Sequence, residues 1–388
     1  MTSTADKLRF EPTALPAALD TLRAEVRAFL KDALVGVPEV KRSHSWEAYD
    51  AEFSAKLGAK GWLGMTLPKQ YGGHGRTALE RYVVVEECLV AGAPTAFHWV
   101  ADRQSGPLVV RYGTEEQKKE IVPAITAGKA CFAIGMSEPN SGSDLASLRT
   151  RAERTATGWK VNGTKIWTSN AHRANYMIAL FRTDPDPTKK HAGLSQFLID
   201  LSKTKGITPR PIQNLAGGRN FNEVAFVDAE LPPDALLGTE GQGWRQVTEE
   251  LAFERSGPER YLSCFYLLRK LIDAVKETAA PATLARLGSQ VAWAATLRTM
   301  SLSIAAKLNA GQDPALEASV VKDLGCQFEQ ALPGLAQELC ELEPTLEGHG
   351  SDYQQVLGAL VQVAPSFSLR GGTPEILRGI IAKGMGVR

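Results

Sequence analysis

The sequence has almost no excess of charge. Its 44 Lys and Arg residues face 43 Asp and Glu residues, so the formal net charge of the 388-residue chain is +1. A chain without a strong positive field is a poor candidate for binding nucleic acid or an acidic membrane surface. We therefore expect small molecules or proteins as partners, and no nucleic acid.

Long apolar runs and paired cysteines are also missing. No stretch approaches the roughly 20 apolar residues of a membrane-spanning helix, and Met1–Phe10 hold charges where a signal peptide has its apolar core. The five cysteines include no C-x-x-C pair, which predicts buried thiols instead of disulfides or a zinc site. The sequence thus predicts no membrane insertion and a reducing, cytoplasmic setting.

Three common catalytic patterns are absent. The six histidines are dispersed with no H-E-x-x-H spacing, so no metal site is predicted. The segment Gly135–Pro139 lacks the G-x-S-x-G pattern of a hydrolase nucleophile. Gly73-His74-Gly75 does not follow a buried parallel strand, which favours a surface loop over a dinucleotide fingerprint.

What is present is a long helical part on each side of a β region. Apolar residues from Leu19 to Leu34 recur at helical spacing, and Thr114 with Gln117 forms a capping-box signal for a second helix. After Pro232-Pro233 the helical period returns and continues to about Cys340. We expect a mainly α protein with a central β domain.

The β region begins near Lys129. Trp159–Trp167 alternates around Asn162-Gly163, which predicts two strands joined by a tight turn. Further strands are expected at Tyr176–Phe181, Gln196–Asp200 and Val224–Val227.

A polar segment, Met136–Asp144, follows the apolar run Cys131–Met136. Its hydroxyls, Asn, Gly and backbone N–H groups could converge on an electron-rich ligand, although an ordinary polar loop explains the composition as well. Trp167 with the hydroxyls of Thr168 and Ser169 could flank a planar aromatic cofactor, whereas a Trp in a β core is the simpler alternative.

Two further segments carry possible chemistry. Near the C-terminus, Gly371-Gly372 precede Thr373 at an N-cap and Pro374 at the first helical position, with Gly384 as the stop, so this helix start could bind phosphate or serve only as a cap. In Leu251–Arg260, Glu254 follows apolar residues that could raise its pKa and make it a general base, unless it is an exposed helical residue.

Together these residues resemble the acyl-CoA dehydrogenase family. Gly61–Gly75 and Tyr112–Lys118 look like its N-terminal signatures, and Ser137–Asp144 is similar to its flavin motif T/S-E-P-x-A/S-G-S-D. Asn162–Asn170 looks like the hairpin that covers the flavin, and Gly371–Ile376 like the C-terminal loop. The motifs follow one another in the family's order.

The resemblance implies three domains: a helical domain over 1–128, a β-barrel-like domain over 129–234 and a C-terminal helical bundle over 235–388. It implies an oxidoreductase that uses FAD to remove two hydrogens across Cα–Cβ of an acyl-CoA. A carboxylate would take the α-proton and flavin N5 the β-hydride. Electrons would pass to an electron-transfer flavoprotein, and the chain would form a homo- or hetero-oligomer.

The resemblance also implies roles for individual residues. The residues expected to contact the cofactor are Ile134, Met136, Ser137, Gly142, Ser143, Trp167, Thr168, Ser169, Thr373 and Glu375. Those expected at the acyl-CoA are Ser143, Phe253, Arg255 and Gly372. Many members carry the base in a Tyr-Glu-Gly-Thr motif, but here that run is Arg370-Gly371-Gly372-Thr373. Some relatives use an x-Glu-Arg pattern instead, which predicts Glu254 as the base and Glu259 as the runner-up.

Two family motifs that bind FAD across a subunit interface are not recognisable. Their places are taken by Leu268–Leu284 and Leu346–Ser351. Either other residues bind the adenine side or a different subunit completes the site. The alternatives to a dehydrogenase are a family variant acting as an oxidase or enoyl-CoA reductase, and a non-catalytic subunit of a hetero-oligomeric dehydrogenase.

Overall fold

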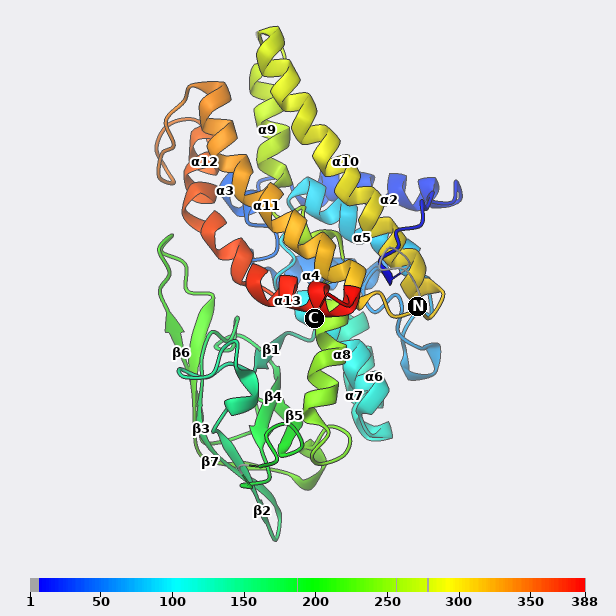
Figure 1. The fold of residues 1–388 in the computed structure, drawn as a ribbon, viewed down its shortest axis with the longest axis vertical. Helices are drawn as coiled ribbons and strands as arrows, with labels where there is room; N and C mark the ends of the chain where they lie inside the picture. Colours follow the sequence, from blue (N-terminus) through cyan, green and yellow to red (C-terminus); the bar gives the residue numbers. More distant parts are fainter. Residues whose placement is uncertain (1–6, 187, 256, 278, 388) are drawn as a thin grey trace. The chain divides into compact units, whose positions relative to one another are not determined.

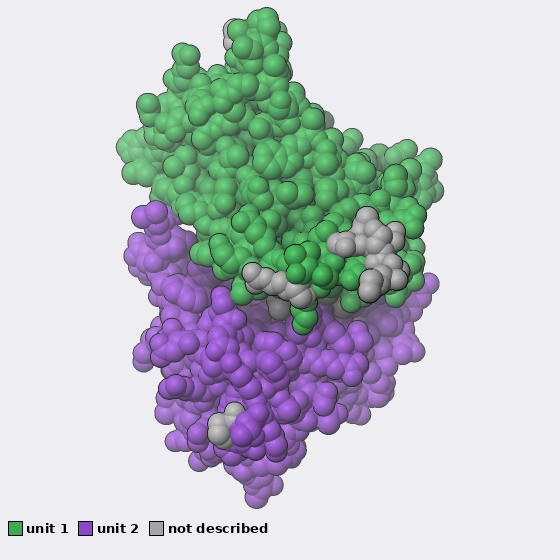
Figure 2. All heavy atoms as spheres, in the orientation of Figure 1, with its two compact units in different colours: residues 1–50, 76–96, 252–388 green, residues 51–75, 97–251 purple. Residues whose placement is uncertain are grey.

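The computed structural model describes residues 7–387 apart from 187, 256 and 278, and not the side chains of residues 251–254. The chain forms two compact units, each built from separate stretches of sequence (Figure 2). Unit 1 comprises residues 1–50, 76–96 and 252–388, and unit 2 comprises residues 51–75 and 97–251. The division into domains at 1–128, 129–234 and 235–388 stays a prediction.

Unit 1 is helical. Its helices are α2 (Leu19–Ala33), α3 (Glu39–Ser43), α5 (Ala78–Ala91), α9 (Phe265–Val275), α10 (Pro281–Asn309), α11 (Ala315–Cys340), α12 (Asp352–Val363) and α13 (Pro374–Met385), with short 3₁₀ turns η5 (Pro258–Arg260) and η6 (Ala364–Leu369). The long helices α10 and α11 run side by side (Figure 1). Ile304 packs there against Ala318 and Val321 in a buried cluster.

Unit 2 combines helices with a sheet. Its elements are α4 (Ala51–Ala59), η1 (Lys69–Tyr71), the π-helix η2 (Ala101–Ser105), α6 (Gly106–Tyr112), α7 (Glu115–Thr126), β1 (Phe132–Gly135), η3 (Leu145–Ser147), β2 (Arg151–Thr155), β3 (Gly158–Lys165), β4 (Tyr176–Arg182), β5 (Leu194–Asp200), β6 (Ile207–Ile212), β7 (Phe221–Leu231), η4 (Pro233–Ala235) and most of α8 (Gly243–Arg255). Thr114 and Gln117 form the predicted capping box at the start of α7.

The described part of unit 2 contains a seven-stranded sheet in the order β1-β4-β2-β3-β7-β6, with β5 paired to β4. The strands β1 and β4 are parallel, whereas β3 and β7 are antiparallel. On β4, Ile178 faces a cluster that includes α6 and α7, and its neighbours Met177 and Ala179 face the inner core. The strand β4 therefore has apolar side chains packed on both of its faces.

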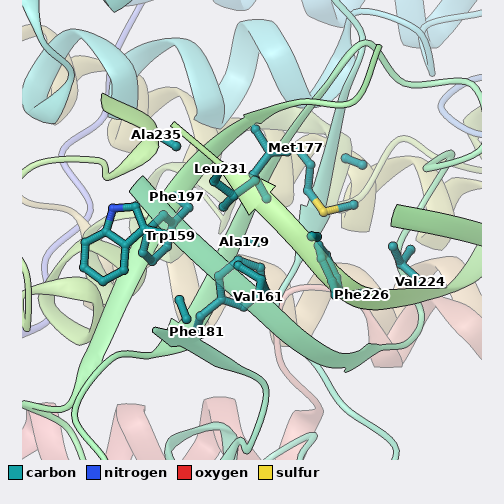
Figure 3. Close-up of a cluster of buried hydrophobic side chains, with 14 of the residues drawn as sticks. Trp159, Val161, Met177, Ala179, Phe181, Phe197, Val224, Phe226, Leu231 and Ala235 are labelled. Atoms are coloured by element: carbon teal, nitrogen blue, oxygen red, sulfur yellow. The ribbon is translucent and has the colours of Figure 1, made fainter. Parts of the chain in front are cut away.

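The inner core of unit 2 is aromatic (Figure 3). Phe181 is fully buried, with its ring 5.2 Å from that of Phe226 in an edge-on arrangement and 5.5 Å from that of Phe197. Trp159 contacts Phe197 edge-on at 5.1 Å. Because these rings come from β3, β4, β5 and β7, they hold the curled sheet together. The predicted fold class, mainly α with a central β domain, is confirmed.

The predicted turn at Asn162-Gly163 is wrong. The strand β3 runs unbroken from Gly158 to Lys165, and the hairpin turn lies earlier, between Thr155 and Gly158. Asn162 instead faces a bulge in β7, where it accepts a hydrogen bond from Asp228 N (2.9 Å) and donates one to Asp228 Oδ1 (3.1 Å). Gly163 is required there because its φ is +144° and a Cβ would lie 2.5 Å from Thr150 Oγ1.

The predicted stop of the last helix is also misplaced. Gly384 lies inside α13, where an added Cβ would lie 2.8 Å from the Leu316 side chain. The helix ends at Met385, and the capping residue Gly386 has a φ of +77°, the left-handed conformation typical of a glycine that follows a helix. Gly384 thus serves close helix packing instead of termination.

All five cysteines are free thiols, and four of them are buried. Among the described residues, none of the helices combines the length and apolar character needed to cross a membrane.

Replacing Phe181 with Ala should destabilise unit 2 by about 3–5 kcal/mol, because the cavity would open between the rings of Phe197 and Phe226. The matched control is Leu215→Ala in the same unit, where the side chain is 84% exposed and the change should stay within about 0.5 kcal/mol. Urea unfolding followed by circular dichroism checks both. Equal midpoints for the two variants would contradict the assignment of this core.

Candidate functional site

The predicted flavin motif forms a compact loop after β1 in unit 2. Glu138 and Ser141 exchange two backbone hydrogen bonds of 3.0 Å, which close a tight turn around Pro139 and Asn140. An added Cβ at Gly142 would have no neighbour within 4 Å. The loop is therefore rigid at its base and open at Gly142 and the exposed Ser143.

A buried ion pair fixes this loop to β3. Lys165 is fully buried, and its Nζ lies 2.9 Å from Glu138 Oε1 and 3.0 Å from the Met136 carbonyl oxygen. Glu138 Oε2 and Oε1 also accept the backbone N–H groups of Arg149 (2.7 Å) and Thr150 (2.9 Å). Every oxygen of this buried carboxylate thus has a donor, which buried charges require.

Glu138 and Lys165 each change the pKa of the other. Burial raises the pKa of Glu138, but the charge of Lys165 and the hydrogen bonds from Thr150 and Arg149 outweigh it, so the pKa lies below its usual value. Burial lowers the pKa of Lys165 to about 8, although Glu138 opposes that change. At neutral pH the pair is mainly ionised.

The backbone next to Lys165 is strained. Trp167 has a φ of +59° and Asn170 one of +55°, a conformation that a bulky side chain such as Trp rarely adopts. Between them, Thr168 exchanges backbone hydrogen bonds of 3.1 and 3.0 Å with Asn222. The indole of Trp167 is 57% exposed as a result. Strain of this kind is typical of functional sites.

Two buried polar atoms in this strained segment are unpaired. Thr168 Oγ1 and Asn170 Oδ1 have no hydrogen-bond partner among the residues that the structure describes. Nearby, the Ile166 N–H donates to the Ser137 carbonyl oxygen at 2.9 Å, which brings the loop and the strand exit together. Open space at Gly142, an exposed indole, and unpaired oxygens near half-buried Ser137 and Ser169 fit a planar polar ring system such as a flavin.

The C-terminal loop is organised separately within unit 1. Gly371 and Gly372 have φ values of +67° and +101°, which only glycine adopts readily. Arg255, at the end of α8, is buried and donates from Nε to the Gly371 carbonyl oxygen at 2.8 Å. An added Cβ at Gly372 would lie 3.3 Å from Arg255 Nη2. This loop is therefore shaped by one arginine and two glycines.

Arg370 anchors the start of this loop. Its guanidinium stacks on Trp46 (3.7 Å to the ring centroid) and Phe367 (4.4 Å), and its Nη2 lies 3.2 Å from Glu329 Oε2. Burial lowers the pKa of Arg370 to about 10, against the opposing charge of Glu329. Thr373 then occupies the N-cap position of α13 with extended backbone angles, although its side chain makes no capping hydrogen bond. Glu375 lies exposed in the first turn, and its own backbone N–H and the Thr373 hydroxyl lower its pKa.

The structure assembles the predicted residues in two groups. Unit 2 holds Ile134, Met136, Ser137, Gly142, Ser143, Trp167, Thr168 and Ser169, and unit 1 holds Arg255, Gly372, Thr373 and Glu375. The side chains of Phe253 and of the predicted base Glu254 lie outside the described residues.

Sequence reasoning assigned no role to Lys165 or to Arg370. Lys165 is a charged residue at the buried end of the alternating strand β3, and Glu138 follows Ser137 in the polar loop. These two residues could have indicated the ion pair from the sequence, because a lysine at a core position needs a carboxylate partner. Arg370 gave no comparable signal, since its partner Glu329 lies on a distant helix.

Replacing Glu138 with Gln should destabilise unit 2 by about 3–5 kcal/mol, because the buried Lys165 ammonium would lose its counter-charge. The control is Glu223→Gln, which removes an exposed pair with Arg210 (3.4 Å) and should cost at most about 1 kcal/mol. Urea midpoints of the two variants give the comparison. A loss no larger for Glu138→Gln than for Glu223→Gln would show that the pair is not essential.

Acid should remove the same contribution in the unmodified chain. The pKa of Glu138 is lowered on folding, so its stabilisation is complete above the unfolded value near 4.5 and is lost as the pH falls through the lower, folded value. Urea midpoints between pH 6 and pH 3 should fall more steeply for the unmodified chain than for Glu138→Gln. Parallel curves would contradict the shift.

Comparison with known proteins places this geometry in one family. The sequence matches the acyl-CoA dehydrogenase N-terminal domain over residues 17–129, the middle domain over 133–229 and the C-terminal domain over 241–386. It is 30% identical over 388 residues to acyl-CoA dehydrogenase FadE26 of Mycobacterium tuberculosis, covering 93% of this chain and 95% of that protein.

Solved structures agree with this match. The Tcur3481-Tcur3483 steroid ACAD has a TM-score of 0.84 at 29% identity, covering 97% of this chain and 99% of that chain. The ChsE4-ChsE5 complex from Mycobacterium tuberculosis has a TM-score of 0.81 at 28% identity, covering 97% and 99%. The resemblance seen in the sequence is confirmed: the chain belongs to the acyl-CoA dehydrogenase family, whose members are FAD-dependent oxidoreductases acting on CH–CH bonds.

Proposed function

We propose that this chain catalyses α,β-dehydrogenation of an acyl-CoA thioester, with Glu254 as the base. The observation that carries the proposal is the loop Met136–Asp144, which the Lys165–Glu138 pair pins next to the strained Trp167 segment. Bound FAD would supply the hydride acceptor for the β-hydrogen. The residues of the chain would hold the ring, orient the thioester and take the α-proton.

The unit 2 residues are suited to holding a ring. Trp167 offers an aromatic face, and the hydroxyls of Ser137, Thr168 and Ser169 lie on the two segments that the Ser137–Ile166 hydrogen bond joins. Ile134 and Met136 are half-buried and supply apolar contact, while Gly142 and Ser143 leave backbone N–H groups accessible. In unit 1, Thr373 and Glu375 at the start of α13 would lie near the ribityl-pyrophosphate.

The choice of Glu254 as base rests on two features of unit 1. Gly371, at the position where many family members carry a glutamate, has no side chain and cannot accept a proton. The residue after Glu254, Arg255, is hydrogen-bonded to the Gly371 carbonyl oxygen, so the end of α8 lies beside that loop. A carboxylate on this helix end would therefore serve the same region from a different chain segment.

Glu259 is the second choice. It lies in η5, is 3% exposed, and its carbonyl oxygen accepts the Ser263 hydroxyl (3.1 Å). A general base must come within hydrogen-bond reach of the proton that it abstracts, and this requirement decides between the two carboxylates. Phe253, Arg255, Gly372 and Ser143 would then line the acyl-CoA.

The relatives support a proposal for the substrate class and the partners. We propose a bulky, ring-containing acyl-CoA, because the chain is similar along its length to the Tcur3481-Tcur3483 steroid ACAD. A second kind of subunit would complete the adenine side of the FAD site. Two family motifs are not recognisable in this chain, and one similar solved structure is the ChsE4-ChsE5 complex. An electron-transfer flavoprotein would accept the electrons.

Replacing Glu254 with Gln should leave bound flavin in place but stop its bleaching by substrate, with at least about a hundredfold loss in rate, since general-base catalysis is worth that much. The matched control is Glu249→Gln on the same helix, where the carboxylate pairs with Arg245 (3.1 Å) and should not affect bleaching. Anaerobic stopped-flow absorbance of the flavin measures both variants.

Glu259→Gln completes this test. If Glu254→Gln bleaches at the normal rate and Glu259→Gln does not, the base is Glu259 and the assignment of Glu254 is wrong.

Flavin absorbance of the purified chain should be weak alone and rise to stoichiometric occupancy with a second subunit. Anaerobic titration of the complex with straight-chain, branched and ring-containing acyl-CoA thioesters should bleach the flavin best with the last. Full occupancy in the chain alone would exclude the need for a partner. Peroxide release without a protein acceptor would instead favour the oxidase alternative.

A further inference from the structure

Two lysines of the described chain are fully buried, and they have different partners. Lys165 pairs with a carboxylate, but Lys322 on α11 forms no ion pair with any carboxylate that the structure describes. Its Nζ lies 3.0 Å from Sγ of Cys326, one helical turn later on the same helix. Cys326 is only 3% exposed. A buried amine and a buried thiol are therefore each other's neighbours.

The surroundings favour the neutral, nucleophilic form of the amine. Burial lowers the pKa of Lys322, and the positive charges of Arg260 and Arg370 lower it further, while Cys326 opposes the change. A neutral amine has a lone pair that can attack an electrophilic sulfur. The opposite arrangement, a lysine held by a carboxylate as at Lys165, would keep that lone pair protonated.

We propose that Lys322 and Cys326 form a reversible redox site, in which hydrogen peroxide drives a covalent sulfur–nitrogen bond between the two side chains. In the first step peroxide oxidises the thiol to a sulfenic acid and is itself reduced to water. In the second step the Lys322 lone pair attacks sulfur, the S–N bond forms, and the S–O bond breaks with loss of water. The protein loses two hydrogens in total, and external thiols reverse the reaction.

Competition from another cysteine on the helix is geometrically poor. Cys340 lies 14 residues further along α11, which is about 21 Å at the helical rise. Lys322 is one turn away and already in contact. The Lys322 amine is therefore better placed than the Cys340 thiol to react with an oxidised Cys326.

The bond would also affect the C-terminal loop. Cys326 Sγ now donates to the Phe367 carbonyl oxygen at 3.2 Å, and Phe367 in turn lies under the Arg370 guanidinium. Bond formation removes the S–H donor and turns Sγ towards Lys322. The segment that leads into Gly371-Gly372 thus loses one of its attachments when the site is oxidised.

Tryptic mapping tests the proposal directly on the full chain. Trypsin normally cuts after Lys322 and releases residues 308–322 and 323–370, but it should not cut at a lysine bonded to sulfur. After hydrogen peroxide and alkylation under denaturing conditions, these two peptides should be lost. A single peptide of residues 308–370 should appear, two hydrogens lighter than the two parts joined, and dithiothreitol should restore cleavage.

Three variants give this test its controls. Lys322→Arg keeps a long basic side chain that is not nucleophilic, so peroxide should take Cys326 on to sulfinic acid. Cys326→Ser should be cut after Lys322 under all conditions, whereas Cys340→Ala should still form the bond. Cleavage after Lys322 that peroxide leaves unchanged, with Cys326 either alkylated or present as sulfinic acid, would overturn the proposal.

Discussion

The buried contact between Lys165 and Glu138 is the constraint on which the candidate flavin region depends. It joins a loop that follows β1 to the end of β3, and the backbone hydrogen bond from Ile166 to Ser137 connects the same two segments. Burying two charges is costly unless every lone pair and proton finds a partner, and here the backbone of Arg149 and Thr150 completes the set. The loop can therefore offer its remaining polar groups to a ligand without losing its shape.

In unit 1, buried arginines fix a loop through partners for their charge and hydrogen-bond donors. Arg370 lies between Trp46 and Glu329, so its flat guanidinium is stacked and hydrogen-bonded at once, and Arg255 holds the Gly371 carbonyl oxygen. Both interactions fix backbone that the two glycines would otherwise leave flexible. Arginine suits this task better than lysine because it remains charged when buried. By contrast, burial lowers the pKa of the Lys322 amine, which pairs with none of the carboxylates that the structure describes.

The sequence predicted helix caps, which depend on a few adjacent residues, but not the contacts between residues far apart in the chain. The capping box at Thr114 and the N-cap position of Thr373 depend on a few adjacent residues, and the structure places both as expected. Asn162-Gly163 misled because a tight turn and a residue opposite a bulge have the same local signature. The strand β6 was missed because its two prolines are unfavourable in a strand interior, although they are tolerated at the edge where β6 lies. The partner of Lys165 depends on folding that brings two distant segments together.

The bulge in β7 also governs which residues the strand can present to the core. Up to Phe226 the even-numbered positions are buried, Val227 and Asp228 are both exposed, and from Ala229 the odd-numbered positions are buried. The extra residue thus shifts the buried positions from even to odd numbers, so that both halves of β7 point their apolar side chains into the same core. The bulge is therefore what lets the sheet accept one extra residue: regular pairing through both Val227 and Asp228 would turn one half of β7 over, whereas deleting Asp228 would leave a regular strand with Phe226 and Ala229 still facing the core.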